Sequence, residues 1–301
     1  MRTRTPRLAA AALAALVLAG CSDGGDAADL GPRTAPGTVT VGSSTSTASR
    51  IEALIYANAL RAAGTPVETK LGLGQGEDAA VAAVERGELT VAPALTGALW
   101  ERYRPGAAQP SKAAEEESEN PRAQWDAQFV ALSAVLPEGL GLGDPTLALD
   151  QPMLFAPKAA PSATLRGCEG LSGAVAVPAG SPSDLRALYG CPTGPIVPVA
   201  DEAAAARAVA EGRAALAQLG TLSPAAKDLA QVADPDGVVP SRAVVPLVRR
   251  DGLTVAQTKR LSAIAGELTT ADLAEMIAEV DAGRRTPEEA TGDWAAEHPM
   301  K

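Results

Sequence analysis

Hydrophobic and polar positions along this chain predict repeated strand and helix units. Residues 38–41 alternate as a strand and lead into a segment rich in hydroxyl groups, residues 42–47. Apolar residues then recur at helical spacing from Ile51 to Leu60, and the pattern stops at Gly64. A strand, a polar turn and a helix in this order indicate an α/β unit.

The same alternation continues through most of the chain. The first region predicts an open parallel α/β sheet, and a second α/β lobe fits between about residues 153 and 235. Residues 104–121 are polar and predict a loop or a solvated helix face. The further predicted strands are Pro66–Leu73, Glu88–Ala92, Met153–Ala156, Ala174–Val177, Ala214–Leu219 and Val244–Val248, and the helices are Glu77–Glu85 and Asp201–Glu211.

Three helix starts are predicted near the C-terminal end. In each, a threonine is followed three residues later by a side chain that can complete a capping box. The pairs are Thr254 with Gln257, Thr269 with Asp272, and Thr286 with Glu289. They predict where helices begin and carry no chemistry.

The N-terminal segment has the order of a bacterial lipoprotein signal. Three arginines precede an apolar run, residues 8–20, which ends in Leu-Ala-Gly before Cys21. That run is shorter than the about 20 residues that span a bilayer, but it suits a secretory signal. Residues 1–20 are therefore the predicted signal peptide and Cys21 the predicted lipidation site. The alternative is a signal anchor with an incidental cysteine.

Residues 21–37 follow as a predicted flexible tether, because they contain Gly, Asp, Ala and Pro and almost no large apolar side chains. Without the three leader arginines the chain keeps 23 basic and 36 acidic residues, a net charge of about −13. Such a surface repels nucleic acid. Lipid on the first mature residue would hold the protein on the extracytoplasmic face of the cell membrane.

Two cysteines remain once Cys21 is assigned to lipid. Outside the cytoplasm a pair is usually a disulfide, so Cys168 and Cys191 are predicted to be bonded. The sharper alternative is a metal site, but two cysteines without a nearby histidine cannot complete a tetrahedral shell. No metal or cofactor is predicted.

The hydroxyl-rich turn is the first candidate site. Ligands of open α/β sheets bind at the carboxyl ends of strands, and Ser43, Ser44, Thr45 and Ser46 lie just after the first predicted strand. The alternative is simple capping of the following helix.

An enzymatic function is not favoured. The single histidine, His298, lies three residues from the end, so it is a poor candidate for a triad or a metal centre. A Gly-x-Ser-x-Gly elbow is lacking, and the glycines of residues 72–76 have neither the spacing nor the setting of a dinucleotide site. The 36 acidic residues give no positional signal for a catalytic carboxylate pair.

Two long segments resemble a known family. Residues 38–100, with VTVGSSTSTASRIEALIYANALRAAG, KLGLGQGEDAAVAAVERGEL and VAPALTGALW, are similar to the opening of the substrate-binding proteins of glycine betaine, carnitine and choline ABC importers. GVVPSRAVVPLVRRDGL and LTTADLAEMIAEVDAGRRTPEEATGDW resemble that family's closing strand and helices. The resemblance implies an α/β, two-lobed type II periplasmic-binding-protein fold with two hinge strands. The expected lobes are residues 38–152 plus 236–301, and residues 153–235.

The resemblance also implies a cage of aromatic rings around a quaternary ammonium group, held by the ring quadrupoles. Here the positions that match the cage are Leu95, Met153 and Gly220, and Ala94 replaces an acidic residue. Three rings at roughly 0.5 to 2 kcal/mol each are a few kcal/mol, against about 8 kcal/mol for micromolar binding. Tight betaine binding is therefore not expected.

The side chains expected around the ligand are polar and uncharged, or apolar. Asp150 is the only carboxylate placed there, to pair a cationic ligand or to brace the hinge. Trp100 stacks on the ligand or belongs to the core, and Tyr56, Phe155 and Trp294 are expected to pack in the core. The candidate ligand-binding residues are Ser43, Ser44, Thr45, Ser46, Leu95, Thr96, Gly97, Asp150, Gln151, Met153, Gln218 and Thr221.

The predicted function is that of a membrane-tethered, monomeric solute receptor of an ABC importer. It would be related to the osmoprotectant receptors, bind a small polar solute and dock on permease subunits. The alternative is an envelope lipoprotein that keeps the fold as a sensor or as a module that binds a protein partner.

Overall fold

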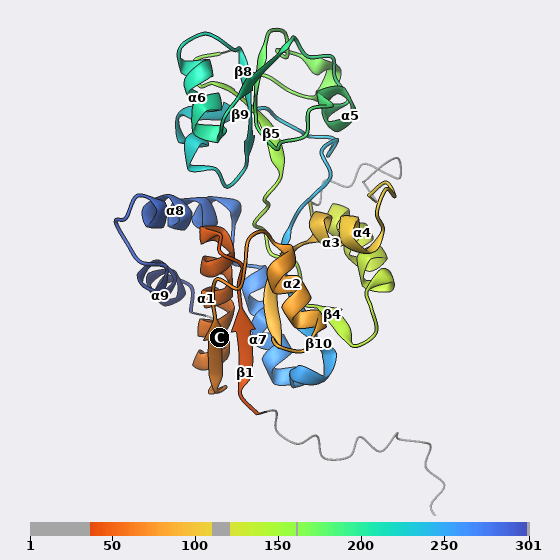
Figure 1. Ribbon diagram of the computed structural model, residues 1–301, viewed down its shortest axis with the longest axis vertical. Coiled ribbons are helices and arrows are strands. Elements are labelled where there is room, and N and C mark those ends of the chain that lie inside the picture. Colours follow the sequence, from red (N-terminus) through yellow and green to blue (C-terminus); the bar gives the residue numbers. More distant parts are fainter. Residues whose placement is uncertain (1–36, 110–120, 161, 300–301) are drawn as a thin grey trace, which may run out of the picture. The chain divides into compact units, whose positions relative to one another are not determined.

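The computed structural model describes residues 37–109, 121–160 and 162–299, except for the side chains of residues 121–127. The predicted signal peptide, Cys21 and nearly all of the predicted tether lie outside these residues. Two five-stranded sheets form the two lobes of an α/β protein, as Figure 1 shows.

The first sheet has the strand order β2-β1-β3-β10-β4. Strand β1 pairs in parallel with β2 and β3, as expected, but β10 is antiparallel to both β3 and β4. The parallel pairing expected for the first region is thus confirmed, and β10 adds an antiparallel strand: it enters beside the last residue of β3, Leu95, and runs back along that strand. The strands are β1 Val39–Gly42, β2 Val67–Lys70, β3 Val91–Leu95, β4 Leu140–Leu142 and β10 Val244–Arg249.

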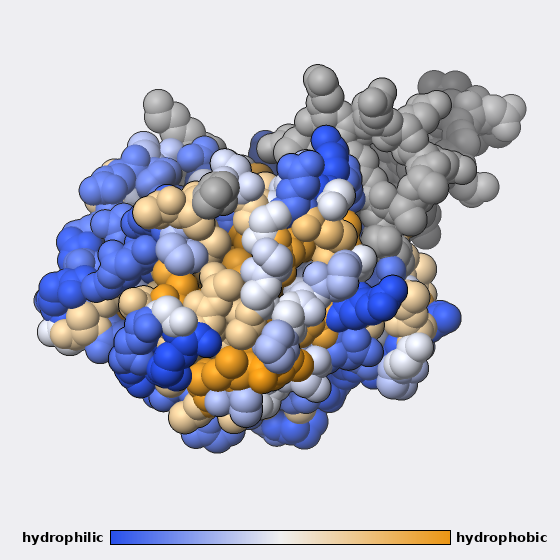
Figure 2. Space-filling model, turned by 90° about the horizontal axis from the view of Figure 1, so that it is seen from above, coloured by the Kyte–Doolittle hydropathy of each residue, from blue (hydrophilic) through white to orange (hydrophobic). Residues whose placement is uncertain are grey.

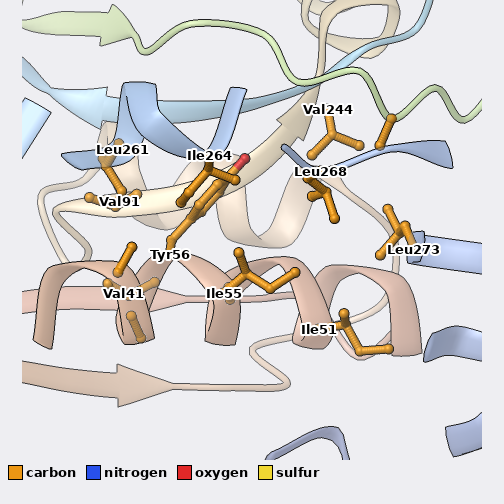
Figure 3. Close-up of a cluster of buried hydrophobic side chains, with 14 of the residues drawn as sticks. Val41, Ile51, Ile55, Tyr56, Val91, Val244, Leu261, Ile264, Leu268 and Leu273 are labelled. Atoms are coloured by element: carbon orange, nitrogen blue, oxygen red, sulfur yellow. The ribbon is translucent and has the colours of Figure 1, made fainter. Parts of the chain in front are cut away.

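Helices cover both faces of this sheet because its strands carry apolar side chains on both. Along β10, Val244 and Val248 pack on one face, whereas Val245 and Leu247 pack on the other. One core joins β1 to α1, α7, α8 and α9; Figure 3 shows Tyr56 of α1 in it. The helices are α1 Thr47–Ala62, α2 Asp78–Glu85, α3 Thr96–Tyr103, α4 Pro121–Val135, α7 Val255–Ala265, α8 Thr270–Asp281 and α9 Pro287–Glu297, with a 3-10 turn at Arg250–Gly252.

The second sheet has the order β7-β6-β8-β5-β9 and a core of its own. Figure 2, seen from above, shows apolar residues between hydrophilic margins; Ile196 and Val238 of this lobe are partly exposed. The elements are β5 Pro152–Pro157, β6 Val175–Pro178, α5 Leu185–Tyr189, β7 Ile196–Val199, α6 Glu202–Ala210, β8 Leu216–Gly220 and β9 Leu229–Gln231, with 3-10 turns at Arg166–Cys168 and Pro224–Asp228.

Two chain segments connect the sheets, one before β5 and one before β10. They run antiparallel: Asp150 N–H donates to the carbonyl of Arg242 (3.0 Å), and Val244 N–H donates to that of Ala148 (3.0 Å). Thr96 joins this pair, because its hydroxyl accepts from Ala243 N–H at 3.0 Å. We call these the crossing segments, residues 143–151 and 232–243.

Several predictions about local structure are confirmed. All three capping boxes form at Thr254, Thr269 and Thr286. Cys168 and Cys191 form a disulfide, which excludes the metal alternative. The strands β4, β7 and β9 and the helices α4 and α5 were not predicted, and β3 begins at Val91 rather than Glu88. Among the described residues, no helix is both long and apolar enough to cross a bilayer.

Candidate functional site

A pocket of about 710 Å³ lies at the edge of the first sheet where β1 and β3 end and β10 begins. This is the edge at which ligands of α/β sheets bind. The lining comes from the turn before α1, the loop before α2, helix α3 and both crossing segments. The lining residues are Ser44, Ser46, Ala48, Gly76, Glu77, Asp78, Ala98, Glu101, Arg102, Asp150 and Arg242.

A second cavity of about 40 Å³ shares part of this lining. Ser46, Ala48, Glu77 and Asp150 line both spaces. The smaller cavity, which we call the inner cavity, is completed by Ser49, Glu52, Pro93, Ala94 and Leu95.

The serine turn holds the start of α1 in place and also faces the pocket. Ser46 is the N-cap, and its hydroxyl accepts from Ser49 N–H at 3.1 Å. Ser44 N–H donates to the hydroxyl of Ser49 at 3.0 Å, and the hydroxyls of Ser44 and Ser46 lie 3.2 Å apart. The capping alternative is therefore correct for Ser46, and the same residue lines the pocket.

The loop before α2 is tied to that turn by backbone hydrogen bonds. Leu73 N–H donates to the carbonyl of Ser43 at 3.0 Å, and Thr45 N–H donates to that of Gly74 at 2.9 Å. Gly76 has a φ of 74°, a conformation that a residue with a Cβ rarely adopts. These contacts place Glu77, the next residue, at the mouth of the inner cavity.

Three carboxyl groups from different elements converge on the inner cavity: Glu52 of α1, Glu77 before α2, and Asp150 of a crossing segment. Burial, reinforced by the negative charges of Asp150 and Glu77, raises the pKa of Glu52 to about 8. Burial also raises the pKa of Glu77 and of Asp150, against the opposing effect of the Arg242 guanidinium. Desolvation disfavours each charged form because little water is left to solvate it.

Among the described residues, Arg242 is the basic group that acts on two of these carboxyls. Its Nη2 lies 3.4 Å from Glu77 Oε1. Its Nε is buried and has no hydrogen-bond partner within the described part of the chain. Gly97 makes room for this side chain, because a Cβ there would lie 2.6 Å from Arg242 Cγ.

The second arginine of the pocket is already paired. Arg102 forms ion pairs with Glu85 at 2.6 Å and with Asp78 at 2.9 Å. Its guanidinium lowers the pKa of Glu85 by hydrogen bonding. Arg102 therefore neutralises the carboxylates at the rim of the pocket, whereas Arg242 is the arginine next to Glu77.

Four of the candidate ligand-binding residues reach these spaces: Ser44, Ser46, Leu95 and Asp150. Asp150 is not the only carboxylate there, in contrast to the expectation, because α1 and the loop before α2 bring Glu52 and Glu77 to the same place. Whether Asp150 pairs with a cationic ligand or braces the hinge stays a prediction.

Other candidates are engaged in internal bonds. Ser43 is fully buried; its hydroxyl donates to the carbonyl of Ser44 and accepts from Gly72 N–H. Thr45 makes the backbone contact to the loop described above. The Thr96 hydroxyl lies 3.3 Å from Gln128 Oε1, to which it donates, and Gly97 packs against Arg242.

The candidates nearer the second sheet form a separate group. Thr221 donates its hydroxyl to the carbonyl of Leu149 at 2.6 Å. Gln151 and Gln218 are buried, and neither Oε1 atom has a partner among the described residues. Gln218 donates to the hydroxyl of Tyr189, and Met153 is fully buried. Whether these residues touch a ligand stays a prediction.

Gly220 stands where an aromatic ring was expected from the resemblance. A Cβ at this position would lie 3.3 Å from Asp150 Oδ1 and 3.3 Å from Glu202 Oε1. Gly220 N–H also donates to Glu202 Oε1 at 2.7 Å. A ring here would displace these carboxylates, so the aromatic position and the acidic arrangement are alternatives.

The aromatic residues considered from the sequence lie in the cores. Trp100 is 6% exposed, and its Nε1 donates to the carbonyl of Ala107, so the core alternative is correct. Tyr56, Phe155 and Trp294 are buried as expected. His298 stacks on Trp294 near the C-terminal end.

Glu52, Glu77 and Arg242 were missed by sequence reasoning. Glu52 had a signal: it follows Ile51 directly and lies four residues before Tyr56, within the apolar face of α1. A charged residue inside such a face must be buried or must border a cavity. Glu77 and Arg242 had no local signal, because only the fold brings them together.

The sequence matches the model of a family described as the substrate-binding domain of ABC-type glycine betaine transport systems over residues 37–126 and 175–297. These two ranges are well over half of the chain. No curated protein matches the sequence significantly.

Solved structures share the fold at low sequence identity. Apo YehZ from Escherichia coli has a TM-score of 0.70 at 19% identity, covering 88% of this chain and 99% of that one. A protein described as a glycine betaine/carnitine/choline ABC transporter has a TM-score of 0.69 at 12% identity, covering 86% and 98%. Lactococcal OpuAC, closed around glycine betaine, has a TM-score of 0.51 at 15% identity, covering 87% and 96%. These likenesses confirm the two-lobed type II periplasmic-binding-protein fold.

Proposed function

Because this chain belongs to the family of substrate-binding domains of ABC-type glycine betaine transport systems, we propose that it is the solute receptor of an ABC importer. The family consists of solute-binding proteins, not enzymes. One observation carries the proposal: a pocket lies at the ligand-binding edge of the first sheet, beside the two crossing segments.

The solute we propose is small and polar, and it is not held by an aromatic cage. In the described lining of both cavities every residue lacks an aromatic ring. Leu95 lines the inner cavity, and Gly220 leaves space that carboxylates use. Glycine betaine and choline would therefore lose the cation–π attraction that rings supply.

The protein around this site would act as a tethered receptor. Lipid on Cys21 would hold a monomer on the extracytoplasmic face of the membrane, and the tether, residues 21–37, would let it reach the permease subunits. The lobes would be residues 38–152 with 236–301, and residues 153–235. Solute that contacts both lobes only in the closed state would shift the population towards closure.

The experiment is a thermal-shift screen of the chain without its predicted leader and lipidated cysteine. The solutes are betaines, choline, carnitine, polyols, sugars and amino acids. A solute at 100 times its dissociation constant stabilises the folded state by about 2.7 kcal/mol, which raises the melting midpoint. A midpoint unchanged by every solute would contradict the proposal and favour an envelope sensor or a module that binds a protein partner.

A further inference from the structure

The inner cavity presents more carboxyl groups than the neighbouring Arg242, which lines the larger pocket, can neutralise. Glu52, Glu77 and Asp150 line it, whereas Arg242 contacts Glu77 at 3.4 Å and influences Asp150 electrostatically. Arg102 is committed to Glu85 and Asp78 at the rim. The interior is therefore short of positive charge.

Glu52 is the side chain that points to a ligand. It is 6% exposed and lines the inner cavity, and the influences on its carboxyl group are burial and the charges of Asp150 and Glu77, with no hydrogen bond from another described residue among them. A buried carboxyl group without partners destabilises the folded state, because it has lost its hydrogen bonds to water. Such a group is unusual unless something bound in the cavity supplies the missing donors.

We propose that the inner cavity binds the ammonium group of a small organic cation that carries N–H donors, that is, a protonated primary or secondary amine. This inference rests on the proposed function as a solute receptor and names the class of solute for the same pocket. Carboxylate oxygens accept charge-assisted hydrogen bonds from N–H groups. A quaternary ammonium group has no N–H to donate, so it would leave the desolvated carboxylates unpaired.

The sizes of the two spaces agree with this assignment. The inner cavity holds about 40 Å³, which admits a few groups of the size of water. An ammonium group has one heavy atom, as water does, and fits with room for a water molecule beside it, whereas a trimethylammonium group has four heavy atoms and needs more room than the cavity offers. The rest of the solute would occupy the pocket of about 710 Å³.

Binding of such a cation would change the protonation of Glu52. Its pKa of about 8 means that the carboxyl group is mostly protonated at neutral pH. Glu77 and Asp150 face it from two other elements and oppose its ionisation, and Tyr56 lies one turn along the same helix. An ammonium group would favour the carboxylate, so the proton of Glu52 would pass to the buffer on binding.

The test is isothermal titration calorimetry with ethanolamine, N-methylethanolamine, N,N-dimethylethanolamine and choline, which differ only in methylation of the nitrogen. We expect ethanolamine to bind at least about tenfold more tightly than choline, a difference of about 1.4 kcal/mol. At pH 7 the binding heat should depend on the ionisation enthalpy of the buffer, because a proton is released.

Two variants assign the effect to the inner cavity. Glu52→Gln keeps the shape of the side chain and should remove most of the preference and the proton release. Asp150→Asn should also weaken ethanolamine binding, by about tenfold. This variant provides the test of the inner cavity if the Glu52→Gln protein does not fold. Glu68→Gln changes an exposed carboxylate of β2 and should leave all values unchanged.

The outcomes separate this inference from the proposed function. Choline bound as tightly as ethanolamine, or glycine betaine bound while ethanolamine is not, would overturn the inference and leave the receptor function supported. Ethanolamine binding without proton release at pH 7 would overturn the role of Glu52. An absence of binding by every solute of the wider screen would count against both.

Discussion

Replacing Glu52 by glutamine should make the protein more stable at alkaline pH, by an amount that follows from the burial of this side chain. The ordinary pKa of the carboxyl group is 4.5, and in the folded protein burial raises the pKa to about 8. The glutamine side chain has nearly the same size but carries no charge. The stability of the two proteins should therefore differ only where the carboxyl group ionises.

The sign follows from proton linkage. Between about pH 4.5 and pH 8 the folded state keeps a proton on Glu52 that the unfolded state has lost, so the free energy of unfolding falls as the pH rises. Each pH unit in this window costs about 1.4 kcal/mol. Over the full window the wild type would lose about 5 kcal/mol of unfolding free energy relative to the variant. Water that enters the pocket solvates the carboxylate in part, so we expect a difference of about 3–5 kcal/mol.

The assay is urea unfolding of the wild type and the Glu52→Gln variant at half-unit steps from pH 4 to pH 9. We expect near equality at pH 4 and a growing advantage of the variant up to about pH 8, with no further change above. Subtracting the free energy of unfolding of the wild type from that of the variant at each pH cancels the contributions of titrating groups that Glu52 does not influence. The Glu68→Gln variant is the control for an exposed carboxylate. If the difference in unfolding free energy stayed constant from pH 4 to pH 9, the conclusion that burial disfavours the ionised form of Glu52 would be refuted.

Three further changes test other parts of the structure. Thr96→Val should lower the free energy of unfolding by about 1–3 kcal/mol, since Ala243 N–H would lose its acceptor; an unchanged urea midpoint would contradict this. Replacing both Cys168 and Cys191 by alanine opens a loop with a sequence separation of 23 residues and should lower the free energy of unfolding by about 3 kcal/mol relative to the oxidised wild type. Under reducing conditions the two proteins should have equal stability, and a difference that persists there would contradict this explanation. Gly97→Ala should displace Arg242 and weaken solute binding at least a few-fold by calorimetry, while equal affinity would show that Arg242 is not used.

Local structure was largely predictable because its causes are local. The three threonine capping boxes lie within four residues each and form as expected. The strand of residues 38–41 and the following helix also appear, as β1 and α1, since their hydrophobic periods differ clearly. The long helix α4 was missed because Pro121–Val135 follows a polar stretch that masks its start.

The amino-acid sequence by itself determined the class of this protein: α/β units in series, a cysteine pair available for a disulfide, and the family. It also showed that aromatic residues are absent at Leu95, Met153 and Gly220. These features depend on residue types and on neighbours along the chain.

Only the tertiary structure showed that acidic side chains gather beside Leu95. Glu52, Glu77, Asp150 and Arg242 are far apart in the sequence, and the folding of α1, the loop before α2 and both crossing segments brings them to one cavity. The same holds for the direction of β10, which depends on where the chain returns from the second sheet. The raised pKa of Glu52 is likewise a property of burial and of nearby charge, because a carboxyl group acquires its desolvation only when the surrounding elements exclude water.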